Sequence, residues 1–130
     1  MIAVVATVAG AFAVDLETEE IEPWDAPLAP PPAADVRLPR LVAAAASGAT
    51  VVAVVDAKPP LLVSYDTGST WRESGRGLPP GRAVAISHDD PDLIVYAGRN
   101  RLFLSRNGGV FWSSLAVELP EILAVVFPGS

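Results

Sequence analysis

Two eight-residue segments of this chain match each other in register, and this repeat restricts the possible folds more than any other feature. Residues 64–71 read SYDTGSTW and residues 105–112 read SRNGGVFW, so both follow the pattern Ser-x-(Asp/Asn)-x-Gly-x-x-Trp. Each segment follows a short apolar run, at 61–63 in one case and at 102–104 in the other. A turn motif that recurs after the same kind of run indicates a repeated supersecondary unit.

The spacing of the tryptophans gives the size of this unit. Trp71 and Trp112 are 41 residues apart, and Trp24 lies 47 residues before Trp71. A period of this length is typical of a four-stranded antiparallel sheet that repeats along the chain. We therefore predict one sheet for about every forty-odd residues, with a degenerate hairpin at 17–20 in the first of them.

The residue types in the repeat suit a tight hairpin turn. Asp or Asn accepts hydrogen bonds from turn N–H groups, Gly adopts a positive φ, and Trp packs as a large apolar anchor. The pattern resembles the Asp-box of the bacterial neuraminidase (BNR) repeat, found in sialidase-like β-propellers as the turn between the third and fourth strands of a blade. The resemblance covers roughly residues 41–127 and implies a structural role for Ser64, Asp66, Gly68, Trp71, Ser105, Asn107, Gly109 and Trp112.

The predicted fold class is all-β, with β-propeller blades of four antiparallel strands and three blades per chain. Hydrophobic residues make up 51% of the chain, and 10 Gly and 13 Pro provide for many turns. The single domain 1–130 divides into blades at about 1–35 plus the C-terminal strand 121–127, at 36–78 and at 79–119. The expected strands are 2–6, 11–16 and 21–25, then 41–46, 51–56, 61–65 and 70–74, then 82–87, 93–97, 101–105 and 110–115.

The two ends of the chain predict an assembly. The first blade has three strands and lacks an innermost one, whereas the apolar run 121–127 is a lone strand that resembles residues 82–88. Three blades fall below the range of roughly four to eight that closed propellers adopt. We expect a homodimer that forms one six-bladed propeller, in which each C-terminal strand completes the first blade of the partner chain. The alternative is that the sequence is a fragment of a longer propeller.

Charge and composition exclude several partners and sites. The net charge is −6, and residues 1–35 hold seven acidic side chains and no Lys or Arg. Without a basic stripe to neutralise phosphates, we expect no nucleic-acid and no membrane partner. The chain has no Cys, so it can form neither a disulfide nor a thiolate metal site.

The apolar opening run 1–14 is interpreted as buried strands. It is shorter than the ~20 residues that span a bilayer, and it lacks the basic segment that begins a signal peptide. This favours a cytoplasmic over a secreted protein and leaves the compartment otherwise open. The Pro-rich segment 26–34 is interpreted as a stiff connector between blades, the alternative being a recognition strip for an aromatic groove.

Candidate ligand-binding residues lie in the loops opposite the Asp-box turns, because the resemblance implies that ligands bind on that face. Arginine forks there suit carboxylate or sulfate groups, the alternative being ordinary solvated side chains. The candidates are Arg76, Arg82, Arg99 and Arg101.

The sequence predicts no catalytic residue, no metal site and no cofactor. Sialidase chemistry needs a Tyr nucleophile beside a carboxylate, but Tyr65 lies inside a turn motif and Tyr96 in the middle of a strand. The turn at His88 is interpreted as a local hydrogen-bonding device. We therefore expect a non-enzymatic binding or scaffold propeller that recognises a protein or glycan; the alternative is a glycan-binding or glycosidase-like protein that uses the central funnel.

Overall fold

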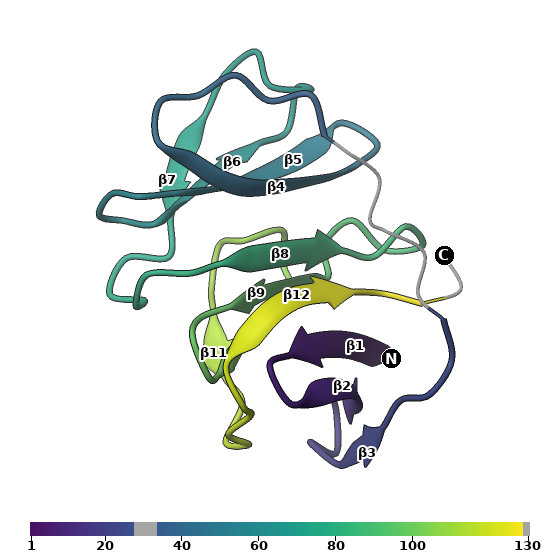
Figure 1. The fold of residues 1–130 in the computed structure, drawn as a ribbon. Coiled ribbons are helices and arrows are strands. Elements are labelled where there is room, and N and C mark those ends of the chain that lie inside the picture. Colours follow the sequence, from purple (N-terminus) through teal and green to yellow (C-terminus); the bar gives the residue numbers. More distant parts are fainter. Residues whose placement is uncertain (28–33, 129–130) are drawn as a thin grey trace.

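The structure is a computed structural model that describes residues 1–27 and 34–128. These residues form twelve β-strands, arranged as three four-stranded antiparallel sheets (Figure 1). The described part of the chain contains no helix, and so no helix long and apolar enough to cross a membrane. The predicted all-β class with four-stranded antiparallel sheets is confirmed.

Two of the sheets consist of four strands that follow one another in the sequence. The β4–β7 sheet and the β8–β11 sheet each pair every strand with its nearest neighbour along the chain, as hairpins require. Gly48 closes the hairpin between β4 and β5 with a φ of 60°. The strands are β4 (Leu41–Ser47), β5 (Thr50–Val55), β6 (Leu61–Ser64) and β7 (Arg72–Ser74), then β8 (Ala83–Ile86), β9 (Ile94–Ala97), β10 (Leu102–Ser105) and β11 (Ser113–Ser114).

The third sheet, called the terminal sheet below, is built from both ends of the chain. Its strand order is β12-β1-β2-β3. Val126 of the last strand lies opposite Val4 of the first, and Val125 lies opposite Val5. The C-terminal strand therefore supplies the edge that the three N-terminal strands lack. The strands are β12 (Ile122–Val126), β1 (Ile2–Thr7), β2 (Gly10–Asp15) and β3 (Ile21–Pro23).

The expected exchange of this strand between two chains is not what the structure has, because β12 pairs with β1 of the same chain. The connector between β3 and β4 explains how this happens. It comprises residues 24–40, roughly twice the length of the connectors 75–82 and 115–121. At ~3.3 Å per extended residue it has ample reach. The chain can therefore place its first three strands beside the β8–β11 sheet and still return to begin β4.

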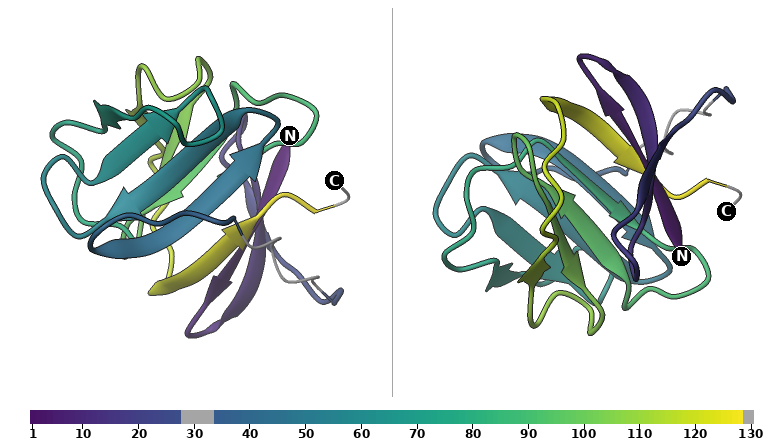
Figure 2. Two further views of the ribbon diagram at one scale, coloured as in Figure 1. Left: turned by 90° about the horizontal axis from the view of Figure 1, so that it is seen from above. Right: turned by 90° about the horizontal axis from the view of Figure 1, so that it is seen from below.

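The sheets are stacked with the β8–β11 sheet in the middle. Strand β8 packs against both β4 and β12, and no strand of the terminal sheet contacts the β4–β7 sheet (Figures 1 and 2). Strands β4, β8 and β12 are thus neighbours, as the innermost strands of adjacent propeller blades are.

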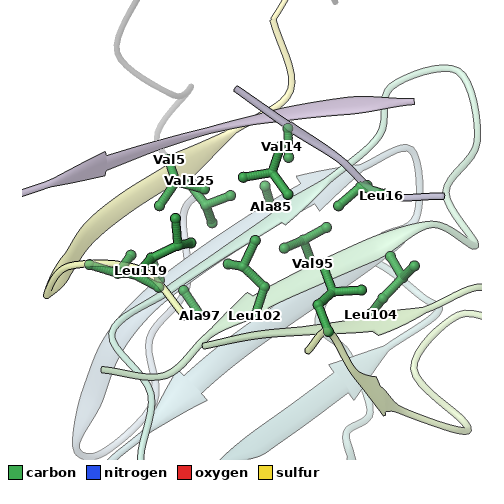
Figure 3. Close-up of a cluster of buried hydrophobic side chains, with 14 of the residues drawn as sticks. Val5, Val14, Leu16, Ala85, Val95, Ala97, Leu102, Leu104, Leu119 and Val125 are labelled. Atoms are coloured by element: carbon green, nitrogen blue, oxygen red, sulfur yellow. The ribbon is translucent and has the colours of Figure 1, made fainter. Parts of the chain in front are cut away.

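Alternating side chains of the middle sheet serve two separate cores. Val84 and Ile86 point into the core shared with the β4–β7 sheet, whereas Ala83 and Ala85 point into the core shared with the terminal sheet. Figure 3 shows this second core, in which Val5 and Val14 face Val95 and Leu102, among others. Full burial of one such Val or Leu contributes about 1.5–3 kcal/mol.

Trp24 lies at the end of the outer strand of its sheet, as the expected strand 21–25 implies, and so differs in position from the other two tryptophans. Its backbone N–H bonds to the carbonyl of Ala11, at the start of β2, so Trp24 follows the outer strand. Trp71 and Trp112 come directly before their outer strands. Glu20 is opposite Asp15 at the end of β2 and takes the equivalent place in the terminal sheet. The terminal sheet has a different turn at this place, described below.

Candidate functional site

The turn at residues 64–71 is held together by its own side chains. The Ser64 hydroxyl donates to Asp66 Oδ1 at 2.7 Å and accepts from the Gly68 N–H at 2.8 Å. Asp66 Oδ1 also accepts from the Thr70 N–H at 2.8 Å, and Oδ2 accepts from the Thr70 hydroxyl at 2.5 Å. Gly68 has a φ of 90°, which favours glycine.

These hydrogen bonds favour the charged form of Asp66. Donation from the Thr70 hydroxyl, then from the Thr70 N–H and the Ser64 hydroxyl, lowers the pKa of the Asp66 carboxyl to about 2. The carboxylate is therefore an acceptor for turn donors at any pH above about 4. Both carboxylate oxygens accept hydrogen bonds within the turn, so the role of Asp66 is to hold the turn together.

The second turn, at residues 105–112, repeats this pattern with an amide. Ser105 Oγ bonds to Asn107 Oδ1 at 3.0 Å and accepts from the Gly109 N–H at 2.8 Å. Asn107 Oδ1 accepts from the Phe111 N–H at 3.0 Å. Phe111 stands where the first turn has Thr70, so the second turn has no hydroxyl to donate to a second carboxylate oxygen. The single amide oxygen of Asn107 is sufficient to accept the remaining hydrogen bonds, from the Ser105 hydroxyl and the Phe111 N–H.

The second turn also fastens its sheet to the preceding one. Trp112 Nε1 donates to Ser74 Oγ at 2.9 Å, and the Ser74 hydroxyl donates to the Gly109 carbonyl. The Tyr65 hydroxyl donates to the Gly108 carbonyl at 2.6 Å. Ser74 and Tyr65 belong to the β4–β7 sheet, so the repeat joins two sheets as well as closing a hairpin.

The terminal sheet has a related turn without the Ser and Gly of the pattern. Asp15 Oδ1 accepts from the N–H groups of Glu17 at 2.9 Å and Thr18 at 3.1 Å, which lowers the pKa of its carboxyl. Glu19 adopts the positive φ of 63° that Gly supplies elsewhere. A carboxylate therefore accepts the turn hydrogen bonds in the 64–71 hairpin and in the hairpin of the terminal sheet, and the Asn107 amide does so in the 105–112 hairpin.

The opposite ends of the strands carry the loop face, defined by residues 56–60, 75–82, 98–101 and 115–121. Two candidate arginines converge there on one carboxylate. Arg82 Nη1 lies 3.2 Å from Glu121 Oε2, and Arg99 Nε lies 3.2 Å from Glu121 Oε1. Arg101 Nη2 lies 3.0 Å from Glu118 Oε1. Arg82, Arg99, Arg101, Glu118 and Glu121 are called the arginine cluster below.

Arg76 is not part of this cluster. It pairs loosely with Glu73, at 3.9 Å, and lines a hollow of about 470 Å³ between the β4–β7 sheet and the second turn. Val110 and Phe111 beside it are 63% and 75% exposed. The structure therefore brings two of the four candidate arginines, Arg82 and Arg99, together on Glu121; it pairs Arg101 with Glu118 in the same connector and places Arg76 elsewhere.

The loop 98–101 of this cluster also hydrogen-bonds to the segment that leads into β12. Asn100 Nδ2 donates to the Leu119 carbonyl at 3.0 Å, and the Leu119 N–H returns a bond to the Asn100 carbonyl at 2.8 Å. The Ile122 N–H donates to the Arg99 carbonyl at 2.8 Å. Sequence reasoning missed Glu118 and Glu121, although both lie in a loop-face connector opposite arginines of the preceding hairpin.

The two tyrosines are engaged in the fold. Tyr65 is bonded to Gly108, as described above, and the buried Tyr96 donates to the Pro79 carbonyl at 2.8 Å. Burial raises the pKa of Tyr96 to about 12, so its hydroxyl stays protonated at neutral pH. Neither tyrosine is arranged as a nucleophile.

The His88 turn is closed by Asp90, whose Oδ1 accepts from the Asp92 N–H at 3.1 Å. Residues 1–27 and 34–128 contain no group of three or more His, Asp or Glu side chains that could hold a metal ion. The Pro-rich segment expected at 26–34 lies mostly outside the described residues, at 28–33.

Comparison with known proteins supports the architecture. A scan against models of protein families finds no match, and no curated protein matches. Among solved structures, the GH74 enzyme of Niastella koreensis is similar, with a TM-score of 0.52, 22% sequence identity and coverage of 95% of this chain. GH74 enzymes are β-propeller glycoside hydrolases, so the likeness shows a propeller-like β fold. This chain spans 19% of the length of that enzyme.

Proposed function

We propose that this protein is a non-enzymatic binding or scaffold propeller with Asp-box turns, which recognises an anionic protein or glycan on its loop face. The observation that supports this most is the convergence of Arg82 and Arg99 on Glu121, each at 3.2 Å. Two guanidinium groups around one carboxylate form a receptor geometry for carboxylates. The carboxylate in the structure comes from the protein itself.

The cluster retains capacity for a further anion. It contains three arginines and two glutamates, and the side chain of Arg99 is 72% exposed. Arginine presents five N–H donors, more than one carboxylate uses. A carboxylate or sulfate of a ligand can therefore bind the outer edges of these guanidinium groups or replace Glu121.

Substitution of Glu121 tests this proposal sharply. Glu121→Gln removes the internal carboxylate. This variant should therefore bind carboxylated and sulfated glycans on an array more strongly than the wild type does. Arg82→Gln with Arg99→Gln should abolish the same signal, whereas Arg106→Gln, in the 105–112 turn and outside the cluster, should leave it unchanged. No binding by the wild type or by Glu121→Gln, in folded protein, would contradict the proposal.

The likeness to a GH74 enzyme gives a second candidate, a glycan-binding or glycosidase-like protein that uses the central funnel. Fluorogenic glycosides separate the two candidates. We expect no sialidase-type hydrolysis, because Tyr65 and Tyr96, the two tyrosines that could serve as its nucleophile, are both engaged in hydrogen bonds to the backbone. Turnover that survives purification to homogeneity would favour the enzyme.

We further propose that the protein assembles as a homodimer with six blades in one ring. Three sheets are fewer than the roughly four to eight blades of a closed propeller. Each chain already completes its own terminal sheet, so this dimer needs no exchange of strands.

A further inference from the structure

Each of the two outer sheets has one face that does not pack against the middle sheet. In the terminal sheet Val5 and Val14 face the middle sheet, so their neighbours Val4 and Ala13, together with Glu22, lie on the other face. In the β4–β7 sheet the outward row is Ala44, Ala53, Leu62 and Glu73. We call these two surfaces the terminal outer face and the β4–β7 outer face. Val4 and Ala53, at their centres, are already buried within the chain, so the accessible parts of the two faces are the edges that carry Glu22 and Glu73.

The two internal interfaces follow one rule. Where the β4–β7 sheet meets the middle sheet, Ser74 at the end of the outer strand bonds to the turn that contains Gly109 and Trp112. Where the middle sheet meets the terminal sheet, the Ala116 N–H, just after the outer strand β11, donates to Glu19 Oε1 in the turn of the next sheet. The outer strand's end therefore contacts the next sheet's turn at both interfaces.

Each end of the stack carries one of the two partners of this contact, without the other. The turn at 67–71 of the β4–β7 sheet has no preceding sheet, and the end of β3 at Trp24 has no following one. Among residues 1–27 and 34–128, neither Trp24 nor Trp71 has a partner for its indole N–H, and Trp24 Nε1 is buried. Trp112, within the stack, does have one.

The connector before β4 leaves room for a preceding sheet. Asp35, Val36 and Arg37 line a hollow of about 230 Å³ with Trp71 and its turn. Gly75, Arg76 and Leu78, which lead into β8, line the equivalent hollow beside Trp112. Segment 35–37 thus occupies the position of a normal inter-sheet connector, and in the middle of the stack such a connector coexists with a packed neighbour.

The two ends also carry opposite charge. Residues 1–35 and 120–130, which include the terminal sheet, contain eight acidic side chains and no Lys or Arg. Residues 36–78, which include the β4–β7 sheet, contain five basic and three acidic side chains. Opposite potentials favour the encounter of these two ends over the encounter of like ends.

We propose that the terminal outer face packs against the β4–β7 outer face of a second copy, and that the same contact is made twice around a twofold axis. The end of β3 then meets the 67–71 turn of the other copy, as Ser74 meets the 109–112 turn within one chain. Six sheets close into a ring. This inference rests on the proposed assembly and identifies the surfaces that form it.

Charge exchange tests these surfaces. One variant carries Glu20→Lys and Glu22→Lys, on the outward side of the terminal sheet, and a second carries Arg37→Glu and Arg40→Glu, beside the β4–β7 outer face; all four side chains are exposed. Each variant alone opposes like charges at both contacts, so its dimer dissociation constant should rise by ~100-fold or more. Light scattering should then report single chains of 13.5 kDa.

Recombination of the variants distinguishes a lost interface from a lost fold. An equimolar mixture of the two variants pairs opposite charges at both contacts, and so does a chain that carries all four substitutions; both should recover the dimer. Arg106→Glu with Asp89→Lys, on the middle sheet, should remain dimeric.

Three outcomes are separable. A dimeric wild type whose variants all remain dimeric overturns these surfaces but leaves the proposed assembly intact. A wild type that is monomeric at every concentration tested overturns both. Variants that dissociate but do not recover on mixing overturn the pairing of opposite charges.

Discussion

Trp112 Nε1 donates a hydrogen bond to Ser74 Oγ at 2.9 Å, and this bond joins the repeat motif of one sheet to the outer strand of the sheet before it. The same serine donates to the carbonyl of Gly109 in the same turn. The tryptophan also stacks edge-on against Tyr96, with ring centroids 6.1 Å apart. The motif at 105–112 therefore acts between two sheets as well as within its own hairpin.

A double-mutant cycle measures this link. Trp112→Phe keeps an aromatic ring but removes the N–H, and Ser74→Ala removes its acceptor. We expect each to lower the free energy of unfolding by about 1 kcal/mol, with a coupling of about 0.5–1.5 kcal/mol in denaturant titrations. Trp71→Phe is the matched control, because Trp71 has no such partner among the described residues, and it should show no coupling to Ser74→Ala.

Asp66 should make stability depend on pH in the acid range. The pKa of its carboxyl is about 2 in the folded protein, below the ordinary value of 3.8. The stabilisation is therefore complete above about pH 4 and is lost as the pH falls towards 2. Asp66→Asn should be less stable than the wild type at pH 6, with a difference that shrinks between pH 4 and pH 2.

Thermal melts at several pH values check this expectation. Thr70→Ala removes the strongest donor to Asp66 and should move the acid loss of stability to higher pH. A constant difference between wild type and Asp66→Asn from pH 6 to pH 2 would contradict the role assigned to this carboxylate.

Gly81 should not tolerate a side chain. A Cβ at this position would lie 2.0 Å from Cε1 of the buried Tyr96 ring, so the ring or the backbone would have to move. Overpacking of this kind costs about 1–3 kcal/mol. Gly81→Ala should lower the unfolding free energy by that amount, and Tyr96→Leu should relieve part of the loss. Gly98→Ala is the control, since its Cβ would meet Phe103 at an ordinary 3.5 Å.

Tyr96 should limit stability in alkali. Burial raises the pKa of its hydroxyl to about 12 in the folded protein, from the ordinary 10.0. The unfolded chain therefore releases this proton first, and stability falls as the pH rises above 10. Tyr96→Phe loses the bond to Pro79, about 1 kcal/mol at pH 7, but its stability should decline less between pH 10 and pH 12. An unchanged decline would contradict this.

The strands and two of the turns could be predicted from the sequence because their signals are local. Apolar runs bounded by Gly, Pro and Asp located the strands to within one or two residues in most cases, and the repeat located the turns at 64–71 and 105–112. The spacing of the tryptophans alone could not show that Trp24 lies at the end of its outer strand whereas Trp71 and Trp112 precede theirs. The turn with Asp15 and Glu19 carries no Ser or Gly that would have shown this.

The candidate site was predictable only in part. The loop-face arginines were visible in the sequence, but their glutamate partners were not, because Arg82 and Glu121 are brought together by tertiary packing. A strand pattern contains no information on which copy of the chain receives the last strand, which in the structure pairs with β1 of its own chain.

A disulfide between the two ends of the chain tests the central claim, that both termini build one sheet within a single chain. Val4 and Val126 are direct register partners in antiparallel strands, where Cα atoms lie ~4.5–5.5 Å apart, a separation that a disulfide spans. The chain has no native Cys, so Val4→Cys with Val126→Cys has one possible pairing within a chain. On non-reducing gels the oxidised protein should run as a cross-linked single chain. A covalent dimer, or no disulfide at all in folded protein, would contradict the account.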